Sequence, residues 1–333
     1  MKDSDLFPQN ILFWSKELGT SHDSLVRLSG GINNNVYRCG TERHWIIKSF
    51  PPNNLSCTDR MQAEVEFLNY ANKVASGFTP KLFHVDFIKR CIILEYLRGV
   101  PVSTNNVRRN QINTAIKFFS LLNCDSSLAS EFISQNASEG YLSLTCHLAN
   151  ICERIDSMSC ANLPPSLMKK SKGRINQLRD TFENVSLMTE RMIENGDVID
   201  TIPSEETCIS PGDFGFHNSI LTDTGLKFFD FEHAGYDDPA KTISDFQLQP
   251  MIPVPQEQLW LLDSLPYPKK DNLLNRISIV SPIMKVKWLC IILSALSRQR
   301  LDQILLNNPS LSKFDVITER LYRFDSFVAK HLE

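Results

Sequence analysis

Two short stretches in the second half of this 333-residue chain decide its fold: SPGDFGFHN at residues 210–218 and FFDFE at residues 228–232. They place Asp213, Asn218 and Asp230 five and then twelve residues apart. The residues between them form two short apolar runs around a Thr-Asp-Thr-Gly turn, a pattern typical of a β-hairpin. Because a hairpin brings its ends together, we expect the three oxygen-bearing side chains to meet.

These side chains favour magnesium chemistry. Any one of them alone is more often part of an Asx turn or a cap than of a functional site. Together they supply the hard oxygen ligands that Mg²⁺ prefers, and Mg²⁺ commonly uses few protein ligands and leaves positions for water and phosphate oxygens. The sequence therefore predicts a magnesium–phosphate site around this hairpin.

The region from Leu25 to about Leu97 predicts a small antiparallel sheet interrupted by one helix. Short β-favouring runs there are separated by Gly, Pro and Asn. These runs are Val36–Cys39, Trp45–Phe50, Leu82–Phe87 and Cys91–Tyr96. Residues 59–74 instead carry Met61, Val65 and Leu68 at helical spacing, with Asp59 at the position of an N-cap.

A lysine and a glutamate in this region form a candidate ion pair. Lys48 lies in the predicted strand at residues 45–50, on the same face as Ile46 and Phe50. A lone strand lysine usually reaches solvent. Glu64, however, falls beside the apolar stripe of the predicted helix and faces inward, whereas Glu66 points away. A buried Glu64 could pair with Lys48 and hold it against the α- and β-phosphates of a nucleotide.

The segment Leu28–Tyr37 contains a possible phosphate-binding turn. Its paired glycines, Gly30 and Gly31, precede three asparagines that end with Asn34 and Asn35. Such residues tolerate positive φ, so backbone N–H groups can turn toward a phosphate. Taken alone, the segment is better explained as a plain hairpin turn.

After Gly99 the pattern becomes mostly helical, with the hairpin described above embedded in it. The predicted fold class is α+β with two lobes: a small N-terminal lobe, residues 1–97, with an antiparallel sheet and one helix, and a larger helical lobe, residues 98–333. A hinge is expected near Glu95–Gly99.

Composition excludes several functional classes. The formal net charge of −3 gives no electrostatic footprint for nucleic acid or an anionic membrane. The most apolar stretch, Trp288–Leu296, is too short to cross a bilayer and is expected to be a buried helix. Nine cysteines without a CxxC pair, and no secretory leader pattern, favour reduced thiols and a cytoplasmic location.

The ordered set of motifs resembles the aminoglycoside phosphotransferase and choline kinase family. The resemblance spans residues 28 to about 246 and is most specific in the Gly-Asp-x-x-x-x-Asn loop that ends at Asn218. It implies a bilobal, protein-kinase-like fold and an ATP-dependent, magnesium-dependent kinase that phosphorylates a hydroxyl group of a small molecule.

By this resemblance, Asp213 would be the catalytic base, while Asn218 and Asp230 would hold magnesium. Lys48 would position the nucleotide phosphates, and Glu64 would hold Lys48. The remaining residues expected to contact ATP are Gly30, Gly31, Asn34, Asn35 and, through the peptide groups of the hinge, Glu95 and Leu97.

Two positions depart from the family pattern. Pro211 stands where the family commonly has a histidine that braces the catalytic loop, so the brace must come from elsewhere or be missing. Glu232 stands where a glycine is usual, and it could be a further metal or water ligand or a solvated side chain. His217, beside Asn218, is expected to be a packed or hydrogen-bonding loop residue.

The sequence says less about the molecule that accepts the phosphoryl group than about the nucleotide site. Residues 251–333 carry eleven Lys plus Arg against eight Asp plus Glu, which favours a sugar-like or other hydroxylated metabolite over a polycationic antibiotic. Two alternatives stay open: a nucleotide-binding pseudokinase or scaffold, and a protein kinase, against which the missing Ala-Pro-Glu element argues.

Overall fold

The structure, a computed structural model, describes residues 7–28, 35–52, 59–104, 107–161, 163–254, 270–308 and 310–332. Contacts divide the chain into two units. The first comprises Met1–Gly140, Cys208–Asp237 and Glu257–Pro266, and the second Tyr141–Thr207, Asp238–Gln256 and Tyr267–Glu333. The lobe boundary expected between residues 97 and 98 stays a prediction.

The first unit contains a five-stranded antiparallel sheet in the order β1-β2-β3-β5-β4. Its strands are β1 (Val26–Arg27), β2 (Asn35–Cys39), β3 (Trp45–Ser49), β4 (Leu82–Asp86) and β5 (Cys91–Glu95). Lys48 lies in the central strand β3, opposite Val36 on one side and Ile92 on the other. All four predicted strands are confirmed.

Helix α2 (Arg60–Val74) lies between β3 and β4 in the chain, as predicted. Asp59 is its N-cap and accepts hydrogen bonds from the backbone N–H groups of Met61 and Gln62. A second helix, α1 (Gln9–Glu17), was not predicted. Its Ile11 is fully buried in a cluster with Tyr37 and Ile47 of the sheet.

The first unit also holds the segment that carries the site. After β5 come β6 (Gly99–Pro101), α3 (Arg109–Leu122) and α4 (Ser126–Ala129); β7 (Cys208–Ser210), η4 (Phe216–Asn218), β8 (Ser219–Thr222), β9 (Gly225–Phe228) and β10 (Gly235–Asp237) follow later in the chain. The predicted hairpin is confirmed as β8–β9. The prediction of helical structure directly after Gly99 is wrong, because residues 99–101 form strand β6, which pairs with β8.

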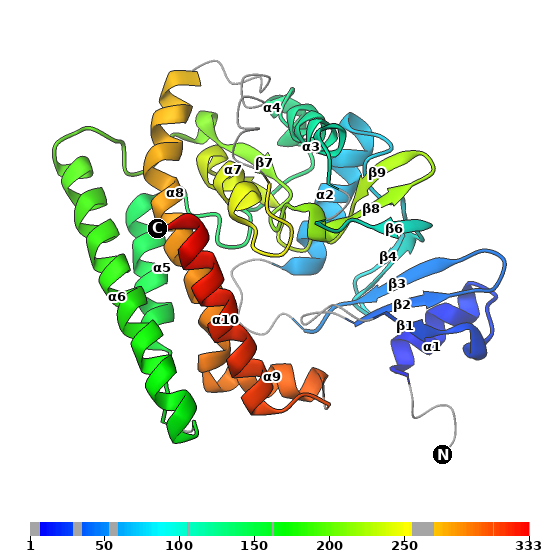
Figure 1. Cartoon of the computed structure of the whole chain (residues 1–333). Helices are drawn as coiled ribbons and strands as arrows, with labels where there is room; N and C mark the ends of the chain where they lie inside the picture. Colours follow the sequence, from blue (N-terminus) through cyan, green and yellow to red (C-terminus); the bar gives the residue numbers. More distant parts are fainter. Residues whose placement is uncertain are drawn as a thin grey trace. The chain divides into compact units, whose positions relative to one another are not determined.

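The second unit is helical. Its elements are α5 (Leu144–Asp156), α6 (Pro165–Glu194), η3 (Ser204–Glu206), α7 (Pro239–Leu248), α8 (Lys270–Ile292), η6 (Leu293–Leu296), α9 (Arg298–Asn307) and α10 (Lys313–His331). Figure 1 shows α6 and α10 running alongside α8. Leu289 of α8 and Phe324 of α10 are fully buried in one core cluster.

One helical stretch, Asn272–Leu296, is long and apolar enough to cross a membrane by length and composition. However, 72% of its most apolar window is buried within the protein. This burial agrees with the buried helix expected around Trp288, because a membrane span would present its apolar side chains to lipid.

Candidate active site

Lys48 lies between two carboxylates that come from distant parts of the chain. Its Nζ atom is 2.5 Å from Oε2 of Glu64 on α2 and 2.5 Å from Oδ1 of Asp230, which follows β9. Lys48 and Glu64 are 4% and 1% exposed. The inward orientation predicted for Glu64 and its ion pair with Lys48 are therefore confirmed, and Lys48 does not reach solvent.

The charges of this group are strongly coupled. Burial by itself would lower the pKa of Lys48, but the carboxylates of Asp230, Glu64 and Glu232 raise it by more, so that Lys48 stays charged. Burial raises the pKa of Glu64 to about 7 against the opposing effect of Lys48. The site therefore holds a buried cation that is fixed among carboxylates.

A cluster of phenylalanines fixes the backbone beneath these acids. Asp230 is followed by Phe231, whose buried ring lies 4.4 Å from the ring of Phe67, one turn after Glu64 on α2. Asp213 is followed by Phe214, which is also buried. The rings of Phe214 and Phe231 both pack near Phe118 of α3. Because each ring is anchored in the core, the preceding carboxylate is held at its surface.

The segments that carry Asp213, Asn218 and Asp230 are joined at the base of the β8–β9 hairpin. The backbone N–H of Phe229, one residue before Asp230, donates to the carbonyl oxygen of Asn218 at 3.0 Å. The side-chain amide of Asn218 donates in turn to the carbonyl oxygen of Asp213, at 3.0 Å, and to its Oδ2, at 3.4 Å. Hydrogen bonds from Phe229 to Asn218 and from Asn218 to Asp213 thus connect these three segments.

His217 contacts the carboxylate of Asp213. Its Nε2 lies 3.0 Å from Oδ2 of Asp213, four residues earlier, and its side chain is only 9% exposed. An Nε2–H tautomer donates in this contact and fixes the carboxylate orientation. His217 is therefore a hydrogen-bonding loop residue, as predicted, and one oxygen of Asp213 is oriented by donors from the loop.

The brace that Pro211 cannot provide comes from other residues. The side chain of Asn123, at the C-terminal end of α3, pairs with the backbone of Ile209. Its Oδ1 accepts from the N–H of Ile209 at 2.7 Å, and its Nδ2 donates to the carbonyl oxygen of Ile209 at 3.1 Å, which is the pairing that a peptide group of a neighbouring strand would make. Gly212 has φ +82°, and its N–H donates to Oγ of Ser210. No sequence pattern indicates this contact of Asn123, since its partner Ile209 lies 86 residues away in the chain.

Asp230 has backbone and side-chain features of a functional residue. Its φ of +69° is uncommon for any residue except glycine, asparagine and aspartate, and such conformations cluster at functional sites. Its side chain is 39% exposed although Oδ1 contacts Lys48. The described residues contain no cluster of three His, Cys, Asp or Glu side chains suited to a metal. That Asn218 and Asp230 hold magnesium stays a prediction.

Glu232 is buried, with 3% exposure, so the prediction that it could be a solvated side chain is wrong. Its Oε1 lies 3.2 Å from Nε2 of His233 and 3.9 Å from a guanidinium nitrogen of Arg60. Phe231 and Glu232 are consecutive and both buried, and a turn follows, in which the N–H of Ala234 donates to the carbonyl oxygen of Phe231 at 3.0 Å. The suggestion that Glu232 is a metal or water ligand stays a prediction.

The other residues expected to contact nucleotide are placed unevenly. Gly30, Gly31 and Asn34 lie outside the described residues. Asn35 begins β2, and its Oδ1 accepts a hydrogen bond from Arg27. The N–H of Glu95 donates to the carbonyl oxygen of Lys81, and the contacts of Glu95 and Leu97 with a nucleotide stay predictions.

The sequence matches no protein-family model and no curated protein. Several solved structures are nevertheless similar to the chain. A choline/ethanolamine kinase family protein from Mesorhizobium loti is 15% identical, with a TM-score of 0.54 over 96% of this chain and 95% of that protein. Choline kinase LicA from Streptococcus pneumoniae is also 15% identical, with a TM-score of 0.57 over 96% and 98% of the two chains.

A spectinomycin phosphotransferase, solved with ADP and spectinomycin, is 10% identical, with a TM-score of 0.57 over 90% of this chain and 92% of that protein. At such low identity these likenesses show the fold alone. The α+β, protein-kinase-like fold predicted from the sequence is confirmed, and it is the fold shared by these choline kinases and aminoglycoside phosphotransferases.

Proposed function

We propose, from the fold this chain shares with small-molecule kinases, that it is an ATP-dependent phosphotransferase acting on a hydroxyl group of a small molecule. The observation that carries the proposal is the buried Lys48, held between Glu64 and Asp230 at 2.5 Å from each. A lysine anchored by a helix glutamate and adjacent to a metal-binding aspartate is the arrangement that phosphoryl transfer uses to hold a nucleotide.

Lys48 would contact the α- and β-phosphates of ATP. Glu64 holds its ammonium group in place in the absence of nucleotide, so little side-chain entropy is lost when phosphate binds. Burial makes the ammonium more effective, because water screens its charge less than at the surface. Lys48 would thus both orient the triphosphate and offset the charge that develops on ADP as it leaves.

The donor set fits magnesium. Asp230 is partly exposed, and the amide nitrogen of Asn218 is used by Asp213, which leaves the Asn218 oxygen for a ligand. Two protein oxygens are typical for Mg²⁺ bound mainly through substrate phosphates. Asn218 and Asp230 would hold the ion, which when bound neutralises phosphate charge.

Asp213 would act on the acceptor. His217 and Asn218 donate to its Oδ2 and orient the carboxylate, which would accept the proton of the acceptor hydroxyl. The acceptor oxygen then forms a bond to the γ-phosphorus, the bond from that phosphorus to the β,γ-bridging oxygen breaks, and ADP leaves with the bonding electron pair. The proton lost by the hydroxyl goes to Asp213.

The charge balance of residues 251–333 supports a sugar-like or other hydroxylated metabolite as acceptor. The cysteine content supports a cytoplasmic setting, where millimolar ATP and magnesium would be present. The proposal involves no nucleic acid or membrane partner.

The test is phosphorylation of a mixture of hydroxylated metabolites in Mg-ATP, with products identified by mass spectrometry. The wild-type protein should yield at least one product that is about 80 Da heavier than its acceptor, which is the mass gain expected for one transferred phosphoryl group. Asp213→Ala should remove this product while nucleotide affinity changes little. Turnover that does not depend on Asp213 would contradict the mechanism, and ATP binding without any product would favour a pseudokinase.

A further inference from the structure

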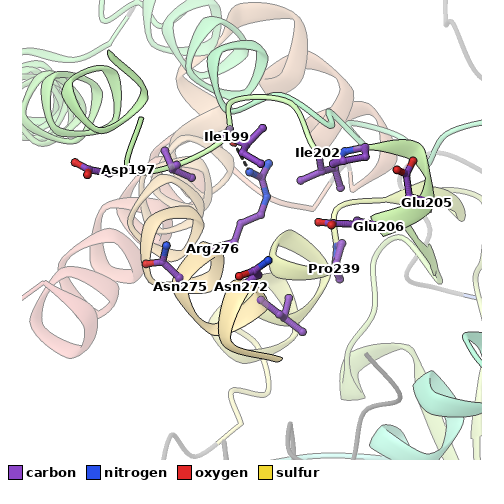
Figure 2. A pocket seen from close by; sticks show the side chains of 12 residues that line it. Asp197, Ile199, Ile202, Glu205, Glu206, Pro239, Asn272, Asn275 and Arg276 are labelled. Carbon is purple, nitrogen blue, oxygen red and sulfur yellow. Dashed lines mark hydrogen bonds between the residues drawn. The ribbon is translucent and has the colours of Figure 1, made fainter. Parts of the chain in front are cut away.

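The cavity shown in Figure 2 is separate from the residues assigned to phosphoryl transfer. It has a volume of about 410 Å³, and the described residues that line it belong to the second unit. Its Arg276 donates to Asp238 at 2.6 Å and to the carbonyl oxygen of Ile199 at 2.7 Å, and so joins α8 to the start of α7 and to the loop that follows α6. The residues assigned to phosphoryl transfer all belong to the first unit: Lys48, Glu64, Asp213, Asn218 and Asp230. That unit contains a further lysine that pairs with an acid of the expected nucleotide site, Lys227 of β9.

Lys227 forms an ion pair with Glu95, the first residue of the expected hinge. Its Nζ atom lies 3.5 Å from Oε2 of Glu95, and the side chains of Lys227 and Glu95 are 13% and 32% exposed. The same oxygen accepts a hydrogen bond from the backbone N–H of Lys81 at 3.1 Å. The carboxylate of Glu95 is thus held by groups from two segments, β9 and the residue that precedes β4.

The chain is fixed again directly after the hinge. Gly99 of β6 pairs with Thr222 of β8. A Cβ atom at Gly99 would overlap the carbonyl oxygen of Leu221, so the two backbones approach closely here. The hinge is therefore attached to the β8–β9 hairpin at both ends, through the side chain of Glu95 and through the backbone of β6.

The strand that carries Lys227 also leads to Asp230, three residues later. In the sheet, Trp45 pairs with Glu95, and Lys48 lies three residues after Trp45. The ion pairs of Lys227 with Glu95 and of Asp230 with Lys48 therefore connect the five-stranded sheet to the β9 segment at two points. These points have the same spacing of three residues along β9 and along β3, so the two segments are held in register.

The part of β9 around Lys227 is itself anchored. The backbone N–H of Phe228 donates to the carbonyl oxygen of Phe78 at 2.8 Å. The ring of Phe228 is 1% exposed and stacks on Phe118, and Leu226 is also buried. Because the residues on either side of Lys227 are fixed in the core, a movement of its partner in the hinge is opposed by the whole strand.

We propose that Lys227 is a positioning residue of the nucleotide site, which holds Glu95 and the peptide groups of the hinge in a fixed place relative to Lys48 and Asp230. The inference rests on the proposed function, since it takes the hinge as the segment that binds adenine and Lys48 as the phosphate contact. A nucleotide that uses both ends of the site gains affinity when their spacing is set in advance, because less ordering remains for the binding step. A polyphosphate without adenine gains nothing from Lys227.

Two probes separate this role from a purely structural one: Mg-ADP and Mg-tripolyphosphate. Calorimetric titration of the full-length protein measures both affinities. Lys227→Met should weaken the binding of Mg-ADP by about threefold, since one partly exposed ion pair contributes up to roughly fivefold. The affinity for Mg-tripolyphosphate should stay unchanged. Unchanged affinity for Mg-ADP, or an equal loss for both probes, would overturn the proposal.

A double-mutant cycle tests whether Lys227 acts through Glu95. Glu95→Gln keeps an acceptor for the N–H of Lys81 but loses the charge, and it should weaken Mg-ADP binding by the same factor as Lys227→Met. The double variant should lose no more than either single variant, whereas additive losses would show that the two residues act separately and would refute the proposal.

Lys227→Arg, which keeps the charge, should restore the wild-type affinity for Mg-ADP. Lys89→Met is the matched control, because it removes a comparable ion pair, 3.4 Å from Asp86, at the opposite end of β5, and it should bind Mg-ADP normally.

The wild-type titration distinguishes failure of this inference from failure of the proposed function. If the wild-type protein binds Mg-ADP and Lys227→Met binds it equally well, only the role of Lys227 is refuted. If the wild-type protein does not bind Mg-ADP, the proposed function is refuted together with it.

Discussion

The Nζ atom of Lys48 lies 2.5 Å from Oδ1 of Asp230, 182 residues later in the chain, and the same atom pairs with Glu64 of α2. One ammonium group therefore joins the sheet, the helix and the loop that follows β9. Lys48 offsets the charge of Asp230, which is partly exposed and lies near two buried carboxylates, those of Glu64 and Glu232. Binding of a magnesium–nucleotide complex would exchange part of this pairing for phosphate and metal contacts.

Replacing Lys48 with methionine should weaken Mg-ATP binding by about tenfold or more and lower kcat further, because both the phosphate contact and the neutralising charge are lost. Calorimetric titration with a non-hydrolysable ATP analogue measures the binding. Lys117→Met, on the exposed surface of α3, is the matched control and should bind normally. Unchanged nucleotide affinity in Lys48→Met would exclude the role proposed for this lysine.

Replacing His217 with alanine should lower kcat by about tenfold while the KM for ATP stays within about twofold. The physical reason is that Oδ2 of Asp213 loses the donor that orients it, whereas the nucleotide contacts are untouched. His217→Gln, which can still donate a hydrogen bond, should recover part of the rate. Steady-state kinetics on the acceptor found in the metabolite screen measures both constants; a rise in KM alone would argue for a purely structural histidine.

Replacing Gly212 with alanine should abolish activity. A Cβ atom there would lie 2.5 Å from the backbone carbonyl of His233, and φ is +82°. Gly196→Ala is a close control, since φ is +76° but nothing lies within 4 Å of its added Cβ. We expect Gly196→Ala to lower the free energy of unfolding by about 1 kcal/mol, because of the backbone strain, and to keep the wild-type turnover. Equal activity of the two variants would show that Gly212 tolerates the contact.

Replacing Phe231 with alanine should lower the free energy of unfolding by about 3–5 kcal/mol, because its ring is buried against Phe67 and Phe118. Urea denaturation measures this change. Phe87→Ala is the control: Phe87 is 59% exposed, and its loss should change stability by less than about 0.5 kcal/mol. A small effect of Phe231→Ala would mean that the aromatic cluster does not anchor the segment that carries Asp230.

His147 of α5 should make stability depend on pH. Burial, with help from Lys241 and Lys287, lowers the pKa of His147 to about 3. The unfolded chain, with a histidine pKa near 6.5, therefore binds more protons than the folded protein between these two values, and stability is lost as the pH falls below about 6.5.

Between pH 7.5 and 5.5 this residue should account for roughly 1.4 kcal/mol of lost unfolding free energy. His147→Phe should remove that part of the pH dependence in urea titrations at the two pH values. His84→Phe, on exposed β4, controls for the loss of a histidine elsewhere. The same slope in His147→Phe and wild type would show that His147 is not buried in its neutral form.

Local pattern was enough to predict most elements of the site. Short β-favouring runs marked β3 and β5, helical spacing marked α2 with Asp59 at its start, and the turn at residues 222–225 marked the β8–β9 hairpin. The inward orientation of Glu64 followed from its angle on the helix. These features depend on residues close in sequence, and a period of 2 or 3.6 residues specifies them.

Contacts between distant segments could not be predicted. β6 was missed because a three-residue strand has too few residues to show alternation and is stabilised by its partner β8. The brace from Asn123 to Ile209 and the burial of Glu232 depend equally on where the backbone turns. The aromatic contact between Phe67 and Phe231 has the same origin.

The sequence by itself determined which chemical groups are available, namely one lysine, four acids and an asparagine in a fixed order, and which short segments are strands or helices. Only the tertiary structure decided that Lys48 pairs with both Glu64 and Asp230, that His217 orients Asp213, and that Glu232 is buried. The physical reason is that local conformation depends on near neighbours, whereas the pairing and burial of charges depend on packing between segments that are far apart in the chain.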